Sequence, residues 1–347
     1  MSLPDPSPPR KFRRLGLWLP FAALGLLIVA WSAAWVWAKG EAARRMDAAV
    51  EALGRAGYPV SWKDRTISGY PFRIDVTLTE ARASGPGGWG LEAARLEGEA
   101  PMHALGSWLI AAPEGLTFVR PVGGPVLVKG DFVRASLTHL GQRPPSLSFE
   151  AVKATFTPQA GAQPFALASA DRVEFHLRAG PNDESGVFAT VDGGKANLTG
   201  LFARIAAGKP VAIVWNATLS KMSAFSGANW PDAVRHWSDA GGRMTVRQAG
   251  LTAGDAVLGV TGGSLGAGRD GRLEGALAVT LRQAPRALSA LSAEGLVAEE
   301  QAQSAITIAQ ARQATGDVAQ ASINFEAGRT TLGPVALGAA PKLYDPR

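Results

Sequence analysis

The spacing of hydrophobic residues changes twice along the chain. Residues 15–38 form one apolar run that contains no charged side chain. Residues 41–55 then repeat apolar side chains at intervals of three and four, which predicts an amphipathic helix that stops at Gly57 and Pro59. From residue 58 onward, apolar and polar side chains mostly alternate, as they do in half-buried β-strands.

The clearest alternating stretch contains Phe72, Ile74, Val76 and Leu78, with polar residues between them. A shorter strand over residues 60–67 precedes it and predicts a hairpin. The alternation changes phase at Ala151, which predicts a β-bulge there. Similar stretches, separated by glycine- and proline-rich turns, lie near residues 147–156, 173–177, 211–219, 273–281 and 323–337. This arrangement indicates antiparallel sheet with one apolar face.

Two helices are expected to interrupt the strands. Asn229 can cap a helix over residues 229–240, and a longer helix is expected over 285–315. The predicted fold is therefore mainly β (α+β): a single N-terminal transmembrane helix, then a large antiparallel β-sheet domain with two or three packed helices. A sheet of this size must cover its apolar face with helices, by curling, or with a ligand.

The predicted organisation has four parts. Residues 1–14 form a basic cytoplasmic tail, 15–38 a transmembrane helix, 39–57 a juxtamembrane helix, and 58–347 an exported β-rich domain. As a helix the apolar run is about 36 Å long, enough for a hydrocarbon core of about 30 Å. A cleaved signal peptide is the alternative, but the apolar run exceeds the usual length of a signal core.

Composition and charge narrow the location and the partners. The net charge is +6, and four basic residues lie between Arg10 and Arg14. The positive-inside rule then predicts a single-pass membrane protein with a cytoplasmic N-terminus and most of the chain exported; in a bacterium these locations are the inner membrane and the periplasm. Nucleic acid is not an expected partner, because no other basic stripe occurs. The absence of cysteine excludes thiolate chemistry and fits an oxidising compartment.

Two glycine motifs resemble catalytic or cofactor signatures but lack the required context. Gly262–Gly266 matches G-x-S-x-G, yet no histidine follows His236 to act as a base. Gly266–Gly271 matches G-x-G-x-x-G, yet an alternating strand follows where a helix is needed. Both are interpreted as one glycine-rich hairpin turn. The four histidines also lack metal-ligand spacing, so we expect no enzyme activity, catalytic residue, cofactor or metal.

Two segments carry a family resemblance. The segment Gly57–Ser84, which contains ISGYPFRIDVTL, resembles the signature of an uncharacterised family of alphaproteobacterial membrane-anchored proteins. Phe325–Tyr344 resembles that family's closing hairpin. The layout is also loosely similar to that of the AsmA-like envelope proteins. This second resemblance implies an apolar groove along a curved sheet for moving lipid.

The sequence therefore predicts a non-enzymatic, membrane-anchored envelope protein that binds lipid or another apolar ligand along a β-sheet groove. Phe72, Ile74, Val76 and Leu78 would line such a groove if they are not core residues. An envelope scaffold that binds a partner protein through a sheet edge or apolar patch is the alternative. A hydrolase is the third hypothesis. The binding residues themselves stay unassigned at this point.

Overall fold

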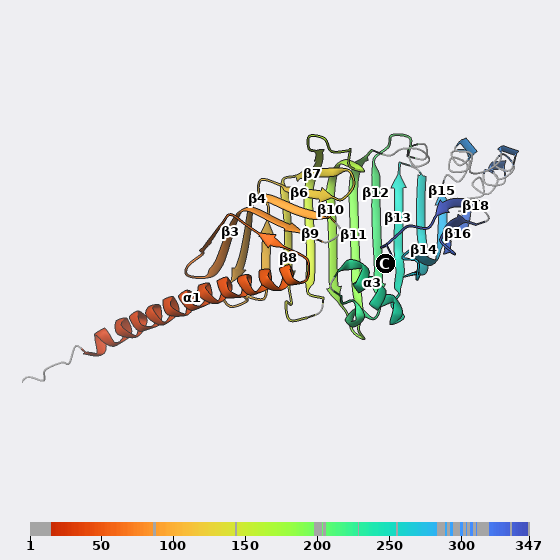
Figure 1. Cartoon of the computed structure of the whole chain (residues 1–347). Coiled ribbons are helices and arrows are strands. Elements are labelled where there is room, and N and C mark those ends of the chain that lie inside the picture. The colour runs from red at the N-terminus through yellow and green to blue at the C-terminus, as the bar shows by residue number, and fades with distance from the viewer. Residues whose placement is uncertain are drawn as a thin grey trace, which may run out of the picture.

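A single antiparallel sheet of 18 strands dominates the computed structural model of the chain, which confirms the predicted fold class (Figure 1). The structure describes residues 15–85, 88–142, 144–197, 206–227, 229–254, 256–282, 319–333 and 335–345. It also describes isolated positions: 203, 289, 292–293, 299–300, 303, 306–307 and 310. The predicted tail 1–14 and most of the predicted helix 285–315 lie outside these residues.

The strands fall into two groups. The N-terminal group comprises β1 (Val60–Ser61), β2 (Asp64–Ser68), β3 (Arg73–Ser84), β4 (Gly90–Pro101), β5 (Trp108–Ala111), β6 (Leu116–Arg120), β7 (Gly124–Lys129) and β8 (Phe132–Thr138). The second group comprises β9 (Ser146–Pro158), β10 (Leu167–Ala179), β11 (Ser185–Ala196), β12 (Val211–Leu219), β13 (Met244–Ala253), β14 (Ala256–Ala267), β15 (Leu273–Arg282), β16 (Ala319–Glu326), β17 (Arg329–Leu332) and β18 (Val335–Ala339).

The sheet forks between β4 and β9. Strand β3 pairs with β1 and β2 along one edge and with β4 along the other. Both β5 and β6 pair with β4, while β8 and β7 pair with β9. Because β5 also pairs with β8 and β6 with β7, two short bridges join the same two long strands. From β9 to β18 the chain is a simple meander of neighbouring strands.

One continuous helix, α1 (Leu15–Arg55), contains both helical segments predicted at the N-terminus. Its first half extends away from the sheet, and its second half lies beside the N-terminal strands (Figure 1). Trp35, Ala38 and Ala42 are buried in one cluster with the inward side chains Ile74 and Val76 of β3. Among the described residues, α1 is the one helix long and apolar enough to cross a membrane.

The helix predicted at Asn229 is present as α3 (Trp230–Asp239). The Asn229 side chain caps it by accepting a 3.0 Å hydrogen bond from the Asp232 amide. Val234 is buried with Ala267 and Tyr344, so α3 closes the end of β14 beside the C-terminal segment. A short 3₁₀ helix, η1 (Met222–Ala224), precedes it.

Three local predictions need correction. Phe72 does not belong to the buried row of β3, because the strand begins one residue later and this ring is 74% exposed. The break in alternation within β9 falls at Lys153, whose φ is 48°, rather than at Ala151. The predicted glycine turn is shorter than expected, since β14 runs through to Ala267 and takes in Ser264.

An ionic cluster ties three strands together on the polar face. The Glu150 carboxylate accepts hydrogen bonds from Arg134 of β8, at 2.6 Å, and from Arg172 of β10. Arg172 also contacts Glu174 at 3.2 Å. The hydrogen bond from Arg134 and then that from Arg172 hold the pKa of Glu150 below its usual range, although burial opposes this.

The lowered pKa predicts how stability varies with pH. The contribution of Glu150 to the free energy of unfolding should be fully present above the unfolded-state pKa of its carboxyl group. It should be lost as the pH falls through the lower folded-state pKa. Glu150→Gln should reduce the free energy of unfolding by about 1 kcal/mol at neutral pH, because both arginines are half-exposed. Urea unfolding at several pH values checks this. The difference between variant and wild type should shrink in acid, and a constant difference would contradict the prediction.

Candidate site: an apolar cavity in the curled sheet

One face of the long meander is apolar across its whole width. Cross-strand partners place Phe149, Phe175, Ala189, Trp215, Ala249, Val260, Val279 and Ala321 in one row across β9 to β16. Neighbouring rows on the same face run from Ala151 to Ala319 and from Leu147 to Ile323, and apolar side chains dominate both. At about 4.8 Å per strand, each row spans roughly 34 Å.

The opposite face carries the polar side chains. There Glu174 stands opposite Thr190, and Arg172 opposite Asp192. His176 lies on this face too, where its Nδ1 is 2.9 Å from the Ser148 hydroxyl and its ring stacks on Phe188. The separation of the two faces follows from alternation along each strand, because successive side chains point to opposite sides.

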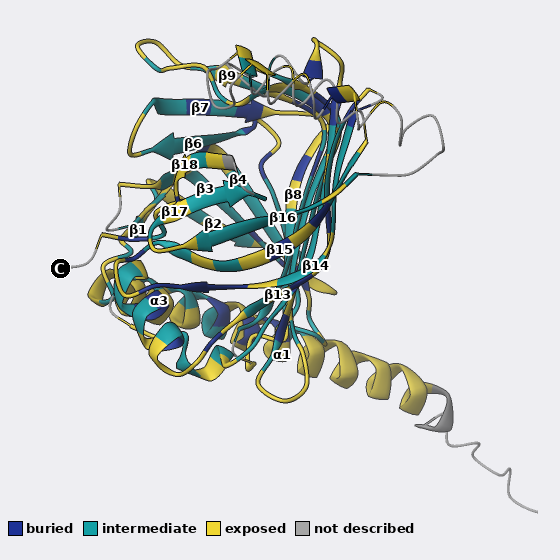
Figure 2. Ribbon diagram, turned by 90° about the vertical axis from the view of Figure 1, so that its right-hand side faces the viewer, coloured by how far each residue is buried: buried dark blue, intermediate teal, exposed yellow. Residues whose placement is uncertain are grey.

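The apolar face deepens into a cavity where the sheet forks. The cavity has a volume of about 950 Å³, near the upper end of the range for small-molecule sites. Its wall is drawn from β1 and from β3 through β10, together with Ala112 and Phe165. In Figure 2, β6 and β7 turn away from the wall formed by the long strands, so the sheet curls around this space.

Two breaks in alternation shape the cavity wall. Glu80 in β3 and Lys153 in β9 both have φ of 48°, in the left-handed region. Consequently Leu78 and Ala81 both face inward although they are three residues apart, and so do Ala151 and Ala154. Each break has an ion pair on its outer side: Glu80 is 2.8 Å from Lys63, and Lys153 is 2.8 Å from Asp131. Such irregularities bend a strand and increase its twist.

One end of the cavity is aromatic. Trp89 stacks on Phe118 with ring centroids 5.2 Å apart, and Phe156 stacks on Phe165 at 5.1 Å. Phe118 meets Phe165 edge to face, which links the two pairs. Because aromatic rings supply large apolar area with few rotatable bonds, this end is a stiff apolar wall.

Arg120 supports the aromatic end from outside the cavity. Its guanidinium lies over the Phe165 ring at 5.6 Å. It also donates hydrogen bonds to four carbonyl oxygens, at distances from 2.6 to 3.3 Å: those of Gly123, Gly124, Gln163 and Pro164. The planar fork of arginine is suited to such multiple contacts. Arg120 therefore fixes the segment that carries Phe165 to the β6–β7 turn.

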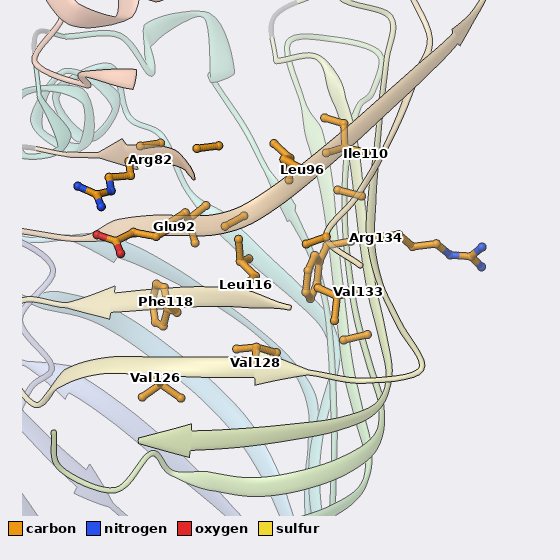
Figure 3. Close-up of a pocket in the computed structure, with 18 of the residues that line it drawn as sticks. Arg82, Glu92, Leu96, Ile110, Leu116, Phe118, Val126, Val128, Val133 and Arg134 are labelled. Atoms are coloured by element: carbon orange, nitrogen blue, oxygen red, sulfur yellow. The ribbon is translucent and has the colours of Figure 1, made fainter. Parts of the chain in front are cut away.

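Charged groups contribute little to the cavity. Its ionisable lining residues are Arg82, Glu92 and Arg134. The charged ends of Arg82 and Glu92, which are cross-strand partners, lie together at one side, and Arg134 points away (Figure 3). The cavity can therefore hold an apolar molecule, with both signs of charge available to a polar end at that side.

The residues predicted for a groove are divided among three places. Leu78 lines the cavity. Ile74 and Val76 continue the same row of β3 but are covered by α1. Phe72 is exposed at the turn before the strand. Residue types alone do not separate these positions, because the division depends on where the helix crosses the strand.

The other sequence motifs do not converge on this cavity. Ser264 sits within β14, and the turn after it, Gly268–Arg272, leads into a strand. Most of the strand carboxylates pair with nearby cations, as Asp75 does with Arg73 at 2.9 Å. Within the described part of the chain, no group of three or more histidine, aspartate and glutamate side chains is placed to hold a metal ion.

Sheet, helix and cavity together define a class: a mainly β protein with an apolar concavity, joined to an apolar N-terminal helix. The chain belongs to the family described as "Uncharacterized protein conserved in bacteria (DUF2125)", which matches residues 35–341. No curated protein and no solved structure matches the chain. The match covers the half of α1 that packs on β3 and all 18 strands of the sheet.

The bonds of Arg120 generate a prediction for the aromatic end. Arg120→Lys should lower the free energy of unfolding by about 1–2 kcal/mol, since an ammonium group cannot reach four separate carbonyls. The Gln163 amide, which donates to the Gly123 carbonyl, should exchange hydrogen faster. Hydrogen–deuterium exchange measures this. Arg269→Lys, on an exposed turn, is the control, and equal exchange in both variants would contradict the assignment.

Proposed function

We propose that this protein is a membrane-anchored envelope protein that binds the acyl part of a lipid in the apolar cavity and along the apolar sheet face. The cavity itself is the observation that carries this proposal. A wall of aliphatic and aromatic side chains offers contact to hydrocarbon but few partners to a polar substrate. Binding without catalysis is the function that such a wall favours.

The apolar surface is continuous from the N-terminal helix to the cavity. Leu78 belongs both to the cluster beneath α1 and to the cavity wall. Leu96 also packs against that cluster and lines the cavity. The apolar cluster beneath α1 therefore adjoins the cavity, which places the cavity next to the apolar helix. This continuity supports a lipid over a water-soluble apolar ligand.

The packing of α1 supports its retention as an anchor. Cleavage near Ala38 would remove Trp35 and Ala38 from the core. It would also break the 2.9 Å hydrogen bond from the Trp35 indole to the Arg73 carbonyl. We therefore propose an uncleaved single-pass anchor in the bacterial inner membrane, with the N-terminus in the cytoplasm and the sheet in the periplasm, as the charge distribution predicts.

Intact-mass measurement tests the retained anchor. Protein purified from the membrane fraction of the expressing bacterium should have the mass of the whole chain, apart from processing of the initiator methionine. A mature protein that begins near residue 39 would contradict this, and it would identify the apolar run as a signal peptide.

Photocrosslinking in living cells tests lipid binding. A photoreactive benzoyl-phenylalanine would replace Phe118 or Phe149, both in the cavity wall, in the full-length protein. The matched control is Phe132, whose exposed ring lies on the outer face under Arg134. Irradiation of cells with ³²P-labelled phospholipid should label both cavity positions several-fold more strongly than Phe132. Mass spectrometry of the adducts would identify the lipid.

A blocking variant completes the test. Ala135→Trp would fill the cavity and should lower the lipid adduct at Phe149, whereas Ser136→Trp, on the opposite face of β8, should not. Equal labelling at Phe149 and Phe132 would overturn the lipid proposal. A protein adduct at Phe118 in place of lipid would favour the scaffold hypothesis.

A further inference from the structure

The turn between β2 and β3 is joined to the apolar part of α1. The Trp31 indole donates a 2.8 Å hydrogen bond to the Pro71 carbonyl, and the Ser32 hydroxyl lies 2.9 Å from that of Tyr70. Trp35 meets Tyr70 edge to face with ring centroids 5.6 Å apart. Trp31, Ser32 and Trp35 all lie within the apolar run, before its first following charge at Lys39.

The contact fixes the height of the turn relative to a membrane. Trp31 precedes the end of the apolar run at Ala38 by about 10 Å along the helix axis. A run of about 36 Å exceeds a hydrocarbon core of about 30 Å, so its last residues stand in the headgroup region. Once α1 spans a bilayer, the turn Gly69–Phe72 must lie at the boundary between headgroups and acyl chains.

The side chains of the turn suit that position. Phe72 is 74% exposed and Tyr70 is 53% exposed, although both are large aromatic residues. Aromatic rings, and above all those with a polar tip, are favoured at this level of a membrane. Cationic groups accompany them: Arg73 follows the turn, and the Lys39 ammonium lies 5.6 Å from the Trp35 ring centroid. Arg73 also pairs with Asp75 at 2.9 Å and with Glu99 at 3.4 Å.

Three of the four carbonyl groups in the turn Gly69–Phe72 accept hydrogen bonds from within the protein. The carbonyls of Gly69 and Phe72 accept hydrogen bonds from the amides of Arg73 and Met102. Those of Pro71 and Arg73 accept from the indoles of Trp31 and Trp35. Unpaired carbonyls would be costly at this depth, so internal partners matter more here than in a turn surrounded by water.

From these observations we infer that the turn Gly69–Phe72 is a second membrane contact, which inserts Tyr70 and Phe72 into the leaflet on the sheet side of the bilayer. The inference rests on the proposed membrane anchor but not on lipid binding in the cavity. With two contacts instead of one, the sheet has a fixed orientation on the membrane. Strand β3 then runs from the bilayer surface toward the cavity, with Ile74 and Val76 covered by α1.

Site-specific fluorescence tests this contact, and the absence of native cysteine makes single labelling sites available. Full-length Phe72→Cys, labelled with a nitrobenzoxadiazole fluorophore, would be reconstituted into phosphatidylcholine–phosphatidylglycerol vesicles. The matched control is Val122→Cys, because Val122 is an apolar turn residue that is 79% exposed. That turn adjoins the far end of β3 and β4, roughly 36 Å from Arg73 along the strand. Leu27→Cys, within the apolar run, reports insertion of the anchor.

The emission of the fluorophore at position 72 should be blue-shifted. Lipids that carry a doxyl group near the headgroup should quench it at least twofold more than lipids that carry the doxyl group deep in the acyl chain. Position 27 should be quenched by deep labels and position 122 by neither. Quenching at 27 without quenching at 72 would overturn the second contact. No quenching at 27 would overturn it together with the anchor. Lipid crosslinks at Phe118 report separately on the cavity. Absence of those crosslinks would therefore not change the interpretation of the quenching at position 72.

Discussion

The side-chain register across the sheet is the constraint on which the rest of the structure depends. Each strand alternates, and the pairing of neighbours places apolar residues opposite apolar ones from β9 to β16. A slip of one residue in any pair would move a whole row to the polar face. The ionic cluster around Glu150 stabilises this register where the fork begins, because it connects β8, β9 and β10 on the outer side. A single apolar face is the result, and that face must be covered by something other than water.

The structure covers the apolar face differently at its two ends. Next to the N-terminal helix, Trp35, Ala38 and Ala42 pack on Ile74 and Val76, so the same helix that is suited to a bilayer also covers the first part of β3. Further along, the sheet forks and curls, and the space inside is left as a cavity instead of being filled. The phase changes at Glu80 and Lys153 bend two of the strands that line this space. The apolar helix, the inward side chains of β3 and the cavity wall thus pack against one another, which is the physical basis for proposing a lipid ligand.

Much of this architecture could be read from the order of residues. Alternation identified the strands, the change of period marked the N-terminal helix, and Asn229 marked the start of α3. These features depend on neighbours within a few positions, so the sequence carries them directly. Membership of an uncharacterised family was likewise visible in the Gly57–Ser84 segment, and the family match bears it out. Phe72 was misplaced because the alternating pattern starts before the strand does. Only the geometry of the turn shows that the strand begins at Arg73.

By itself, then, the sequence determined the kind of fold: a mainly β chain behind one apolar helix, with apolar and polar residues sorted to opposite faces. It could not show that Leu78 lines a cavity. Nor could it show that Ile74, four residues earlier on the same face, is covered by α1. That division depends on where α1 crosses β3 and on how two distant strands bend. The same holds for the contact of Trp31 and Ser32 with a turn almost forty residues away. Local pattern fixes which side a residue faces, whereas contacts between distant segments decide what it faces.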